Sequence, residues 1–120
     1  MDKVYYMDGY HGGVYGHMPL GSVRDVLDTL KEHPDWKVNF EIEPVSYEFL
    51  KDRDPEAYEE ITKLVKEGKQ MEIVSGSYGQ PYGWITDGES NIRHLVLGRK
   101  TLKKHFPDTD IESYVVQEPC

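Results

Sequence analysis

Residue types that can do chemistry are concentrated near the start of the chain, where Asp8, His11 and His17 lie among four glycines. Glycine lets the backbone take positive φ angles and approach a ligand closely. An aspartate and a histidine together can bind a metal ion or transfer protons. We therefore predict that Asp8 and His11 form part of a site. The alternative is that Asp8 caps a local turn and His11 is a surface residue; His17 is interpreted as structural.

A second unusual stretch covers residues 75–84 and reads Ser-Gly-Ser-Tyr-Gly-Gln-Pro-Tyr-Gly-Trp. It contains three aromatic side chains, Tyr78, Tyr82 and Trp84, which is more than a simple connection between two elements requires. Aromatic rings in such a loop can contact a ligand or pack within the loop itself. The sequence leaves both interpretations open.

Apolar periodicity predicts the strands that would position these residues. Short apolar runs that end in aspartate, glycine, serine or proline are typical of strands. Four such runs occur, at residues 3–7, 36–42, 71–74 and 111–116. In the second run apolar and polar residues alternate from Trp36 to Ile42, which predicts a strand with one apolar face.

Apolar residues at spacings of three and four predict helices between these strands. The first helix covers residues 22–33, and a pair of helices covers residues 45–51 and 55–67. The last helix follows Asp87 or Ser90, either of which can cap it, and runs to Phe106. Ser22 is the expected N-cap of the first helix, and Gly68 is the expected stop of the third.

Strict alternation of strands and helices predicts an α/β fold with a parallel sheet and helices outside it. In such sheets the loops after the carboxyl ends of the strands collect the binding groups. Four such loops, at residues 8–17, 41–43, 75–84 and 117–120, are polar or aromatic, whereas the opposite connections are charged turns. We therefore expect the unusual residues to meet at one edge of the sheet.

Composition limits the partners of the chain. Its 120 residues fit one domain, and its formal charge of −8, from 22 acidic and 14 basic residues, argues against nucleic-acid binding. Cys120 is the only cysteine, which excludes an internal disulfide. No apolar run approaches the roughly 20 residues of a membrane span, and no signal peptide precedes the first strand. We expect a cytoplasmic protein that does not bind membranes; the oligomeric state stays open.

Three segments, at residues 30–41, 64–69 and 88–100, resemble the N-terminal catalytic domain of family 38 glycoside hydrolases, the retaining α-mannosidases. The most specific of them begins at Gly88-Glu89-Ser90-Asn91. The resemblance implies a seven-stranded parallel β/α barrel, shared with the polysaccharide deacetylases. Residues 1–120 would supply its first half, about four βα units, as a single N-terminal portion that is truncated after the fourth strand.

The resemblance also implies a divalent metal, usually zinc, that holds sugar hydroxyls, and an aspartate nucleophile in the loop of the fourth strand. Glu118, followed by Pro119, matches the nucleophile with Glu in place of Asp. Glu118 is also a possible third metal ligand or a frayed terminal residue. The family carries a His-x-Asp metal pair after its first strand, whereas this chain has Asp8 and His11 in the reverse order.

For the substrate, the resemblance implies a carbohydrate. Glu41 and Glu43 alternate onto the polar face of the second strand, which faces the lumen or mouth of a closed barrel. Glu43, nearer the end of the strand, is the better candidate for a sugar hydroxyl. Tyr78, Tyr82 and Trp84 are candidates to stack on a sugar ring, with loop packing as the alternative.

We therefore predict part of a metal-dependent retaining glycoside hydrolase, similar to α-mannosidases, that hydrolyses O-glycosidic bonds. One alternative is a metal-dependent carbohydrate deacetylase on the related barrel. Another is a non-catalytic carbohydrate-binding or structural remnant. The acid/base carboxylate and the remaining metal histidine of such an enzyme would lie beyond Cys120, so we expect these 120 residues to be inactive on their own.

Overall fold

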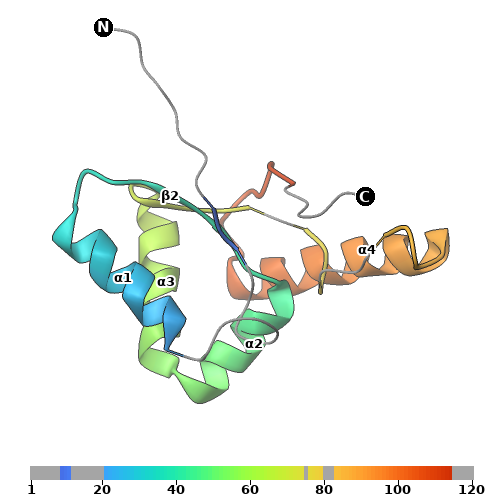
Figure 1. The fold of residues 1–120 in the computed structure, drawn as a ribbon, viewed down its shortest axis with the longest axis horizontal. Helices are drawn as coiled ribbons and strands as arrows, with labels where there is room; N and C mark the ends of the chain where they lie inside the picture. The colour runs from blue at the N-terminus through green and yellow to red at the C-terminus, as the bar shows by residue number, and fades with distance from the viewer. Residues whose placement is uncertain (1–8, 12–20, 75, 80–82, 115–120) are drawn as a thin grey trace, which may run out of the picture.

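The structure is a computed structural model that describes residues 9–11, 21–74, 76–79 and 83–114, with the backbone alone for residues 9–11. Helices and strands alternate along this part of the chain (Figure 1). In chain order they are β1 (Gly9–His11), α1 (Ser22–Glu32), β2 (Val38–Glu41), α2 (Pro44–Arg53), α3 (Pro55–Glu67), β3 (Met71–Ile73) and α4 (Gly88–His105). The alternation confirms the predicted α/β class.

The three strands form one parallel sheet, and their order in the sheet, β1-β2-β3, is their order in the chain. In register, Tyr10 lies beside Phe40, and Phe40 lies beside Ile73. Each helix contacts at least one other helix: α1 packs on α3, α3 on α2, and α2 on α4. Figure 1 shows α1, α2 and α3 together on one side of the strands. The carboxyl ends of the strands, and the loops that follow them, therefore share one edge.

The hydrophobic core lies between the sheet and the helices. Apolar side chains from β2, β3 and all four helices are removed from water there, which is the main force that stabilises the fold. The contributors include Phe40 and Ile73 from the strands, Val23, Leu27 and Leu30 from α1, Tyr47 and Leu50 from α2, Ile61 and Val65 from α3, and Leu102 from α4. The predicted apolar stripe of the first helix is thus confirmed.

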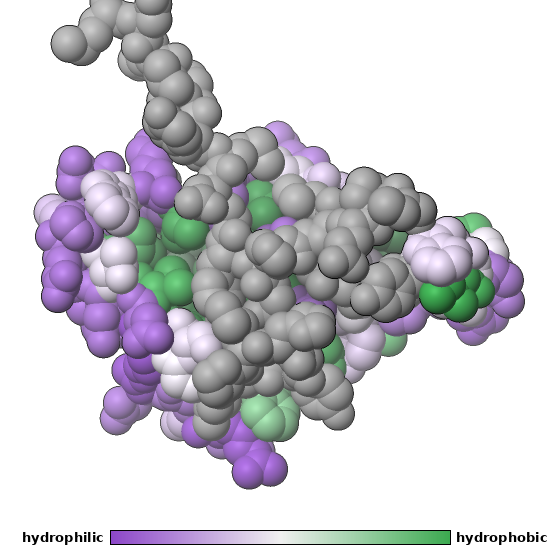
Figure 2. Space-filling model, viewed as in Figure 1, coloured by the Kyte–Doolittle hydropathy of each residue, from purple (hydrophilic) through white to green (hydrophobic). Residues whose placement is uncertain are grey.

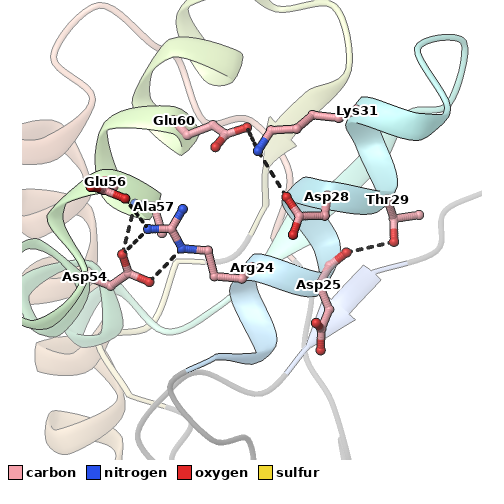
Figure 3. A network of polar contacts seen from close by, with 9 residues as sticks. All are labelled: Arg24, Asp25, Asp28, Thr29, Lys31, Asp54, Glu56, Ala57 and Glu60. Carbon is pink, nitrogen blue, oxygen red and sulfur yellow. Dashed lines mark hydrogen bonds and ion pairs between the residues drawn. The ribbon is translucent and has the colours of Figure 1, made fainter.

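Two groups of ion pairs join α1 to α3 (Figure 3). Arg24 binds Asp54 through two hydrogen bonds, Nε to Oδ2 at 3.0 Å and Nη2 to Oδ1 at 2.5 Å. Asp54 also accepts a hydrogen bond from the backbone N–H of Ala57 at 3.2 Å and so caps the start of α3. Farther along α1, Lys31 pairs with Glu60 at 3.0 Å. The N-cap of one helix is thereby held by a side chain of its neighbour.

The helix ends test the predicted caps. Gly68 ends α3 in the left-handed region, with φ at 62°, as predicted. Asp87 caps α4 by accepting a hydrogen bond from the backbone N–H of Ser90 at 2.7 Å, which confirms the first of the two predicted caps. The prediction of Ser22 as a cap is wrong, because Gly21 is the N-cap of α1 and Ser22 is the first residue inside the helix.

The strands differ more from the predictions than the helices do. Trp36 is not part of β2, because a hydrogen bond from its N–H to the His33 carbonyl closes a turn just before the strand. The strand predicted at residues 3–7 lies outside the described residues, and β1 falls within the stretch predicted as a loop. Residues 111–114 form no strand, contrary to the prediction for residues 111–116. Local apolar pattern specifies a strand only weakly without its partners.

Among the helices that the structure describes, none is both long enough and apolar enough to cross a membrane. The longest of them, α4, carries six charged side chains along its 18 residues.

Candidate functional site at the carboxyl edge of the sheet

The carboxyl ends of β1 and β2 bring a histidine and a glutamate next to each other. His11 is the last residue of β1 and Glu41 the last residue of β2, and the two are partners in the register of the sheet. Backbones of neighbouring strands lie about 4.8 Å apart. Glu41 is only 2% exposed, so its carboxylate is held inside the protein at this edge. An imidazole and a buried carboxylate on adjacent strands are groups that can bind a cation or exchange a proton.

Glu43 lies two residues beyond β2, at the N-cap position of α2. Its carboxylate accepts a hydrogen bond from the hydroxyl of the fully buried Ser46 at 3.1 Å, which directs the half-buried side chain toward the first turn of the helix. The negative charge of Glu43 also reaches Tyr47. Burial first, and this charge second, raise the pKa of the Tyr47 hydroxyl well above its usual value, so the hydroxyl stays protonated.

Tyr78, in the loop after β3, joins α2 to α4. Its backbone N–H donates to the carbonyl of His94 in α4 at 3.0 Å, and its carbonyl accepts from the N–H of Val45 in α2 at 3.3 Å. Its hydroxyl donates to the Glu48 carboxylate at 2.9 Å. The half-buried ring of Tyr78 is therefore fixed between the two helices at the carboxyl edge.

This loop lies directly on α4 because residue 98 is glycine. A Cβ at Gly98 would meet the Gly76 carbonyl oxygen in direct overlap and would lie 2.7 Å from the backbone N of Tyr78. Both obstacles are backbone atoms, which cannot move aside as a flexible side chain can. Gly98 thus lets the segment after β3 cross the helix at backbone contact distance, and it fixes the height of Tyr78 above α4.

Trp84 lies in the turn before α4 and is 67% exposed. The turn is held by Asn91, whose amide donates to the Gly83 carbonyl at 3.0 Å and whose Oδ1 accepts from the Thr86 hydroxyl at 2.7 Å. A fixed turn of this kind presents the indole to solvent at the start of α4. The sequence reasoning missed Asn91; its signal was an amide side chain in the first helical turn, within reach of a glycine-containing turn.

The structure describes some of the predicted site residues and not others. His11, Glu43, Tyr78 and Trp84 all belong to loops or strand ends on the carboxyl side of the sheet. Asp8, Tyr82 and Glu118 lie outside the described residues, as does His17, and for His11 the backbone alone is described. Within the described ranges, no three His, Cys, Asp or Glu side chains form a group that could hold a metal ion. The zinc site stays a prediction.

A second polar cluster, which the sequence reasoning missed, is enclosed by the helices. His105 is 6% exposed, and its Nδ1 lies 2.8 Å from the hydroxyl of Tyr58. Burial, followed by the charge of Lys104, lowers the pKa of His105 below its usual value, so the ring is held neutral. Its Nε2 and the hydroxyl of Tyr47 have no hydrogen-bond partner among the described residues. The cluster is linked to the carboxyl edge by the charge of Glu43, which acts on Tyr47, and by the charge of Glu48, which acts on His105 and also binds Tyr78.

Comparison with known proteins places these features in a family. The glycosyl hydrolases family 38 N-terminal domain matches residues 19–116. An alpha-amylase of Pyrococcus horikoshii is 29% identical over 104 residues, which is 77% of this chain and 16% of that protein. An alpha-mannosidase 2 of Arabidopsis thaliana is 36% identical over 78 residues, which is 62% of this chain and 6% of that protein.

The fold is also found in a solved structure. The crystal structure of a 4-alpha-glucanotransferase from Thermococcus litoralis superposes with a TM-score of 0.73 at 18% identity, over 95% of this chain and 19% of that chain. The chain thus spans less than a fifth of the length of each of these relatives. Because the family match runs from the residues before α1 to the residues beyond α4, the chain belongs to the family of the glycosyl hydrolases family 38 N-terminal domain.

Proposed function

We propose that this chain supplies the first half, about four βα units, of the seven-stranded catalytic barrel of a retaining glycoside hydrolase. The enzyme would hydrolyse the O-glycosidic bonds of a carbohydrate with the help of a divalent metal. The observation that carries the proposal is the family 38 match over residues 19–116, which includes the elements whose carboxyl ends hold Glu41, Glu43 and Tyr78.

The barrel is supported by the way the chain winds. The strands lie in the sheet in the same order as in the chain, as they do in a barrel whose strands are added in one direction. The helices form a continuous layer in which α1 contacts α3, α3 contacts α2, and α2 contacts α4. The outer surface of α4 adds support: Ile92, Leu95 and Val96, at helical spacing, are 58%, 39% and 49% exposed. Figure 2 shows apolar surface at the end of the molecule where α4 begins. A helix with apolar residues on two faces suits a layer in which it has neighbours on both sides.

For the metal, we assign Asp8 and His11 as ligands, with Glu118 as nucleophile or third ligand. Carboxylate oxygen and imidazole nitrogen are donors that zinc accepts, and the backbone register that sets His11 beside the buried Glu41 adds a carboxylate to the same edge. A divalent metal, when bound, would orient sugar hydroxyls by accepting their oxygen atoms as ligands. The carboxylate of Glu118 would attack the anomeric carbon as the bond to the leaving-group oxygen breaks. A second carboxyl group, about 5 to 5.5 Å away, would give its proton to that oxygen.

For the substrate, we assign Glu43 to a sugar hydroxyl and the rings of Tyr78, Tyr82 and Trp84 to the apolar face of a pyranose. The exposed indole of Trp84 is the strongest of these assignments, because the turn that carries it is already held by Asn91 and its backbone would lose little entropy on binding. Tyr78 retains its ring for contact although its hydroxyl is bound to Glu48.

The proposal is tested by titrating the full-length protein with Zn²⁺ in a calorimeter and repeating the titration with three variants. We expect stoichiometric uptake that Asp8→Ala and His11→Ala each abolish and that His17→Ala, from the same glycine-rich stretch, leaves intact. Addition of mannose or maltose to the zinc-loaded protein should then cause a change in tryptophan fluorescence that EDTA reverses and that Trp84→Phe abolishes. Uptake that is absent, or equal in all three variants, would refute the metal site.

A further inference from the structure

The chain has two tryptophans, Trp36 and Trp84. Trp36 precedes the amino end of β2 and therefore lies away from the carboxyl edge. Trp36 is in the turn between α1 and β2, before the amino end of the strand, and is 51% exposed. Figure 1 shows this turn and the start of α4, which follows Trp84, at opposite ends of the long axis of the molecule. Trp36 therefore cannot share one small ligand with Trp84.

Trp36 is supported from one side by an imidazole. The rings of His33 and Trp36 are stacked, with centroids 4.1 Å apart and planes inclined by 13°. The stacking covers part of one face of the indole, and about half of the side chain remains open to solvent. A flat apolar ring with a backing ring on one face and water on the other is a surface to which a second flat apolar face can bind.

The backbone below the two rings is fixed by several hydrogen bonds. The Trp36 N–H donates to the His33 carbonyl at 3.0 Å, and the His33 N–H donates to the Thr29 carbonyl at 3.0 Å. The amide of Gln70 donates to the carbonyls of His33 at 3.1 Å and of Leu30 at 3.0 Å. Because the turn is tied to both α1 and the start of β3, Trp36 is already ordered before any ligand arrives, and binding would cost little conformational entropy.

The residues on either side of Trp36 in the sequence are polar and could complete a binding surface. Asp35 and Lys37 are both exposed. A carboxylate and an ammonium group accept from and donate to hydroxyl groups. An exposed apolar ring whose two sequence neighbours carry an acceptor and a donor suits a sugar, which presents C–H groups on the face of its ring and hydroxyls around its edge.

We propose that Trp36, backed by His33, is a second carbohydrate-binding platform, which takes a pyranose unit of an oligosaccharide by stacking and leaves its reducing and non-reducing ends free. The class of ligand rests on the proposed function, but the site is separate from the carboxyl edge and needs no metal. On a polymeric substrate, such a platform would hold the chain near the enzyme while another part of the same molecule reaches the catalytic edge.

The two tryptophans allow each platform to be observed alone. In the Trp84→Phe variant, Trp36 is the only tryptophan, and we expect maltoheptaose or mannotriose to change its fluorescence saturably in the millimolar range, with EDTA present. The better of the two sugars identifies a glucan or a mannan as the source of the pyranose. His33→Ala in the same background should weaken binding, because the indole loses its support. Trp36→Ala should weaken calorimetrically measured binding about tenfold.

Fluorescence of Trp36 that stays constant with both sugars, or calorimetric binding that Trp36→Ala leaves unchanged, overturns the proposal. The Trp36→Phe variant, in which Trp84 is the only tryptophan, separates this result from a failure of the proposed function. If the fluorescence of Trp84 changes with sugar in a metal-dependent way while that of Trp36 does not change, the platform is refuted and the proposed function is not. If the fluorescence of Trp36 changes with sugar and that of Trp84 does not, the platform is supported and the assignment of Trp84 to the substrate is refuted.

Discussion

Gly98 shows how a single residue decides where a candidate binding loop lies. The loop after β3 crosses α4 at this position, with its backbone where a side chain of any other residue would begin. The hydrogen bonds of Tyr78 to His94 and Val45 depend on this close approach. A change at Gly98 therefore acts on the stability of the protein and on the placement of Tyr78 at once.

We expect Gly98→Ala to lower the free energy of unfolding by about 1–3 kcal/mol, the usual cost of overpacking, because the new Cβ meets backbone atoms. Urea unfolding monitored by circular dichroism measures the change. The matched control is Gly88→Ala in the same helix, where an added Cβ has no atom within 4 Å. Equal stability of the two variants would show that the loop does not lie on α4 as described.

At the scale of elements, α1 and α3 are joined by a bidentate ion pair that also organises a helix start. Arg24 holds Asp54, and Asp54 caps α3 (Figure 3). Both side chains are partly shielded, at 32% and 17% exposure, whereas Lys31, which pairs with Glu60, is 55% exposed. Exposed ion pairs contribute little to stability, and shielded bidentate pairs contribute more.

Arg24→Met should therefore destabilise the protein by about 1 kcal/mol, while Lys31→Met, which removes an exposed charge from the same helix, should have a smaller effect. Parallel urea titrations at low salt compare the two variants. The order of the two effects is the test: a larger loss for Lys31→Met would contradict the role assigned to the capped pair.

The elements also show what could be predicted from the sequence. The helices and the caps at Gly68 and Asp87 were predictable because their causes lie within a few residues. The strand run that included Trp36 was misjudged, because alternation continued into a turn that hydrogen bonds from α1 and Gln70 fix. The placement of His11 beside Glu41 depends on the register between strands 30 residues apart, which no local pattern contains.

The candidate site was predictable in outline for a similar reason. Parallel topology assigns the loops after the strands to one edge, so the sequence alone could place Glu43, Tyr78 and Trp84 in loops that follow β2 and β3. Their individual contacts were not predictable, because the partner of each side chain comes from another element, as Glu48 does for Tyr78. The burial of His105 also arises from three helices together and left no signal in its own segment.

At the scale of the whole molecule, His105 and Asp54 make the stability of the fold depend on pH, each in its own range. Burial lowers the pKa of His105 below 6.5, so the unfolded chain binds this proton more readily and stability falls as the pH drops below about 6.5. The hydrogen bond from Arg24 lowers the pKa of Asp54 below 3.8. Its contribution is complete above that pH and is lost as the pH falls further.

We expect the free energy of unfolding to decrease between pH 7 and pH 5, and the His105→Gln variant to show a flatter profile over this range while keeping the loss below about pH 4. Urea titrations at a series of pH values give both profiles. Tyr58→Phe is the control, because it removes the hydroxyl near His105 but keeps the titrating ring. An unchanged slope in His105→Gln would assign the effect to another group.

The order of the strands bears on how the protein forms during its synthesis. β2 pairs with the strand made before it and β3 pairs with β2, while α3 packs on α1 and α4 packs on α2. Each new segment leaving the ribosome therefore meets a surface that already exists and does not wait for a distant one. A chain of this topology can build its core progressively, and its early part can fold while the later part is still being translated.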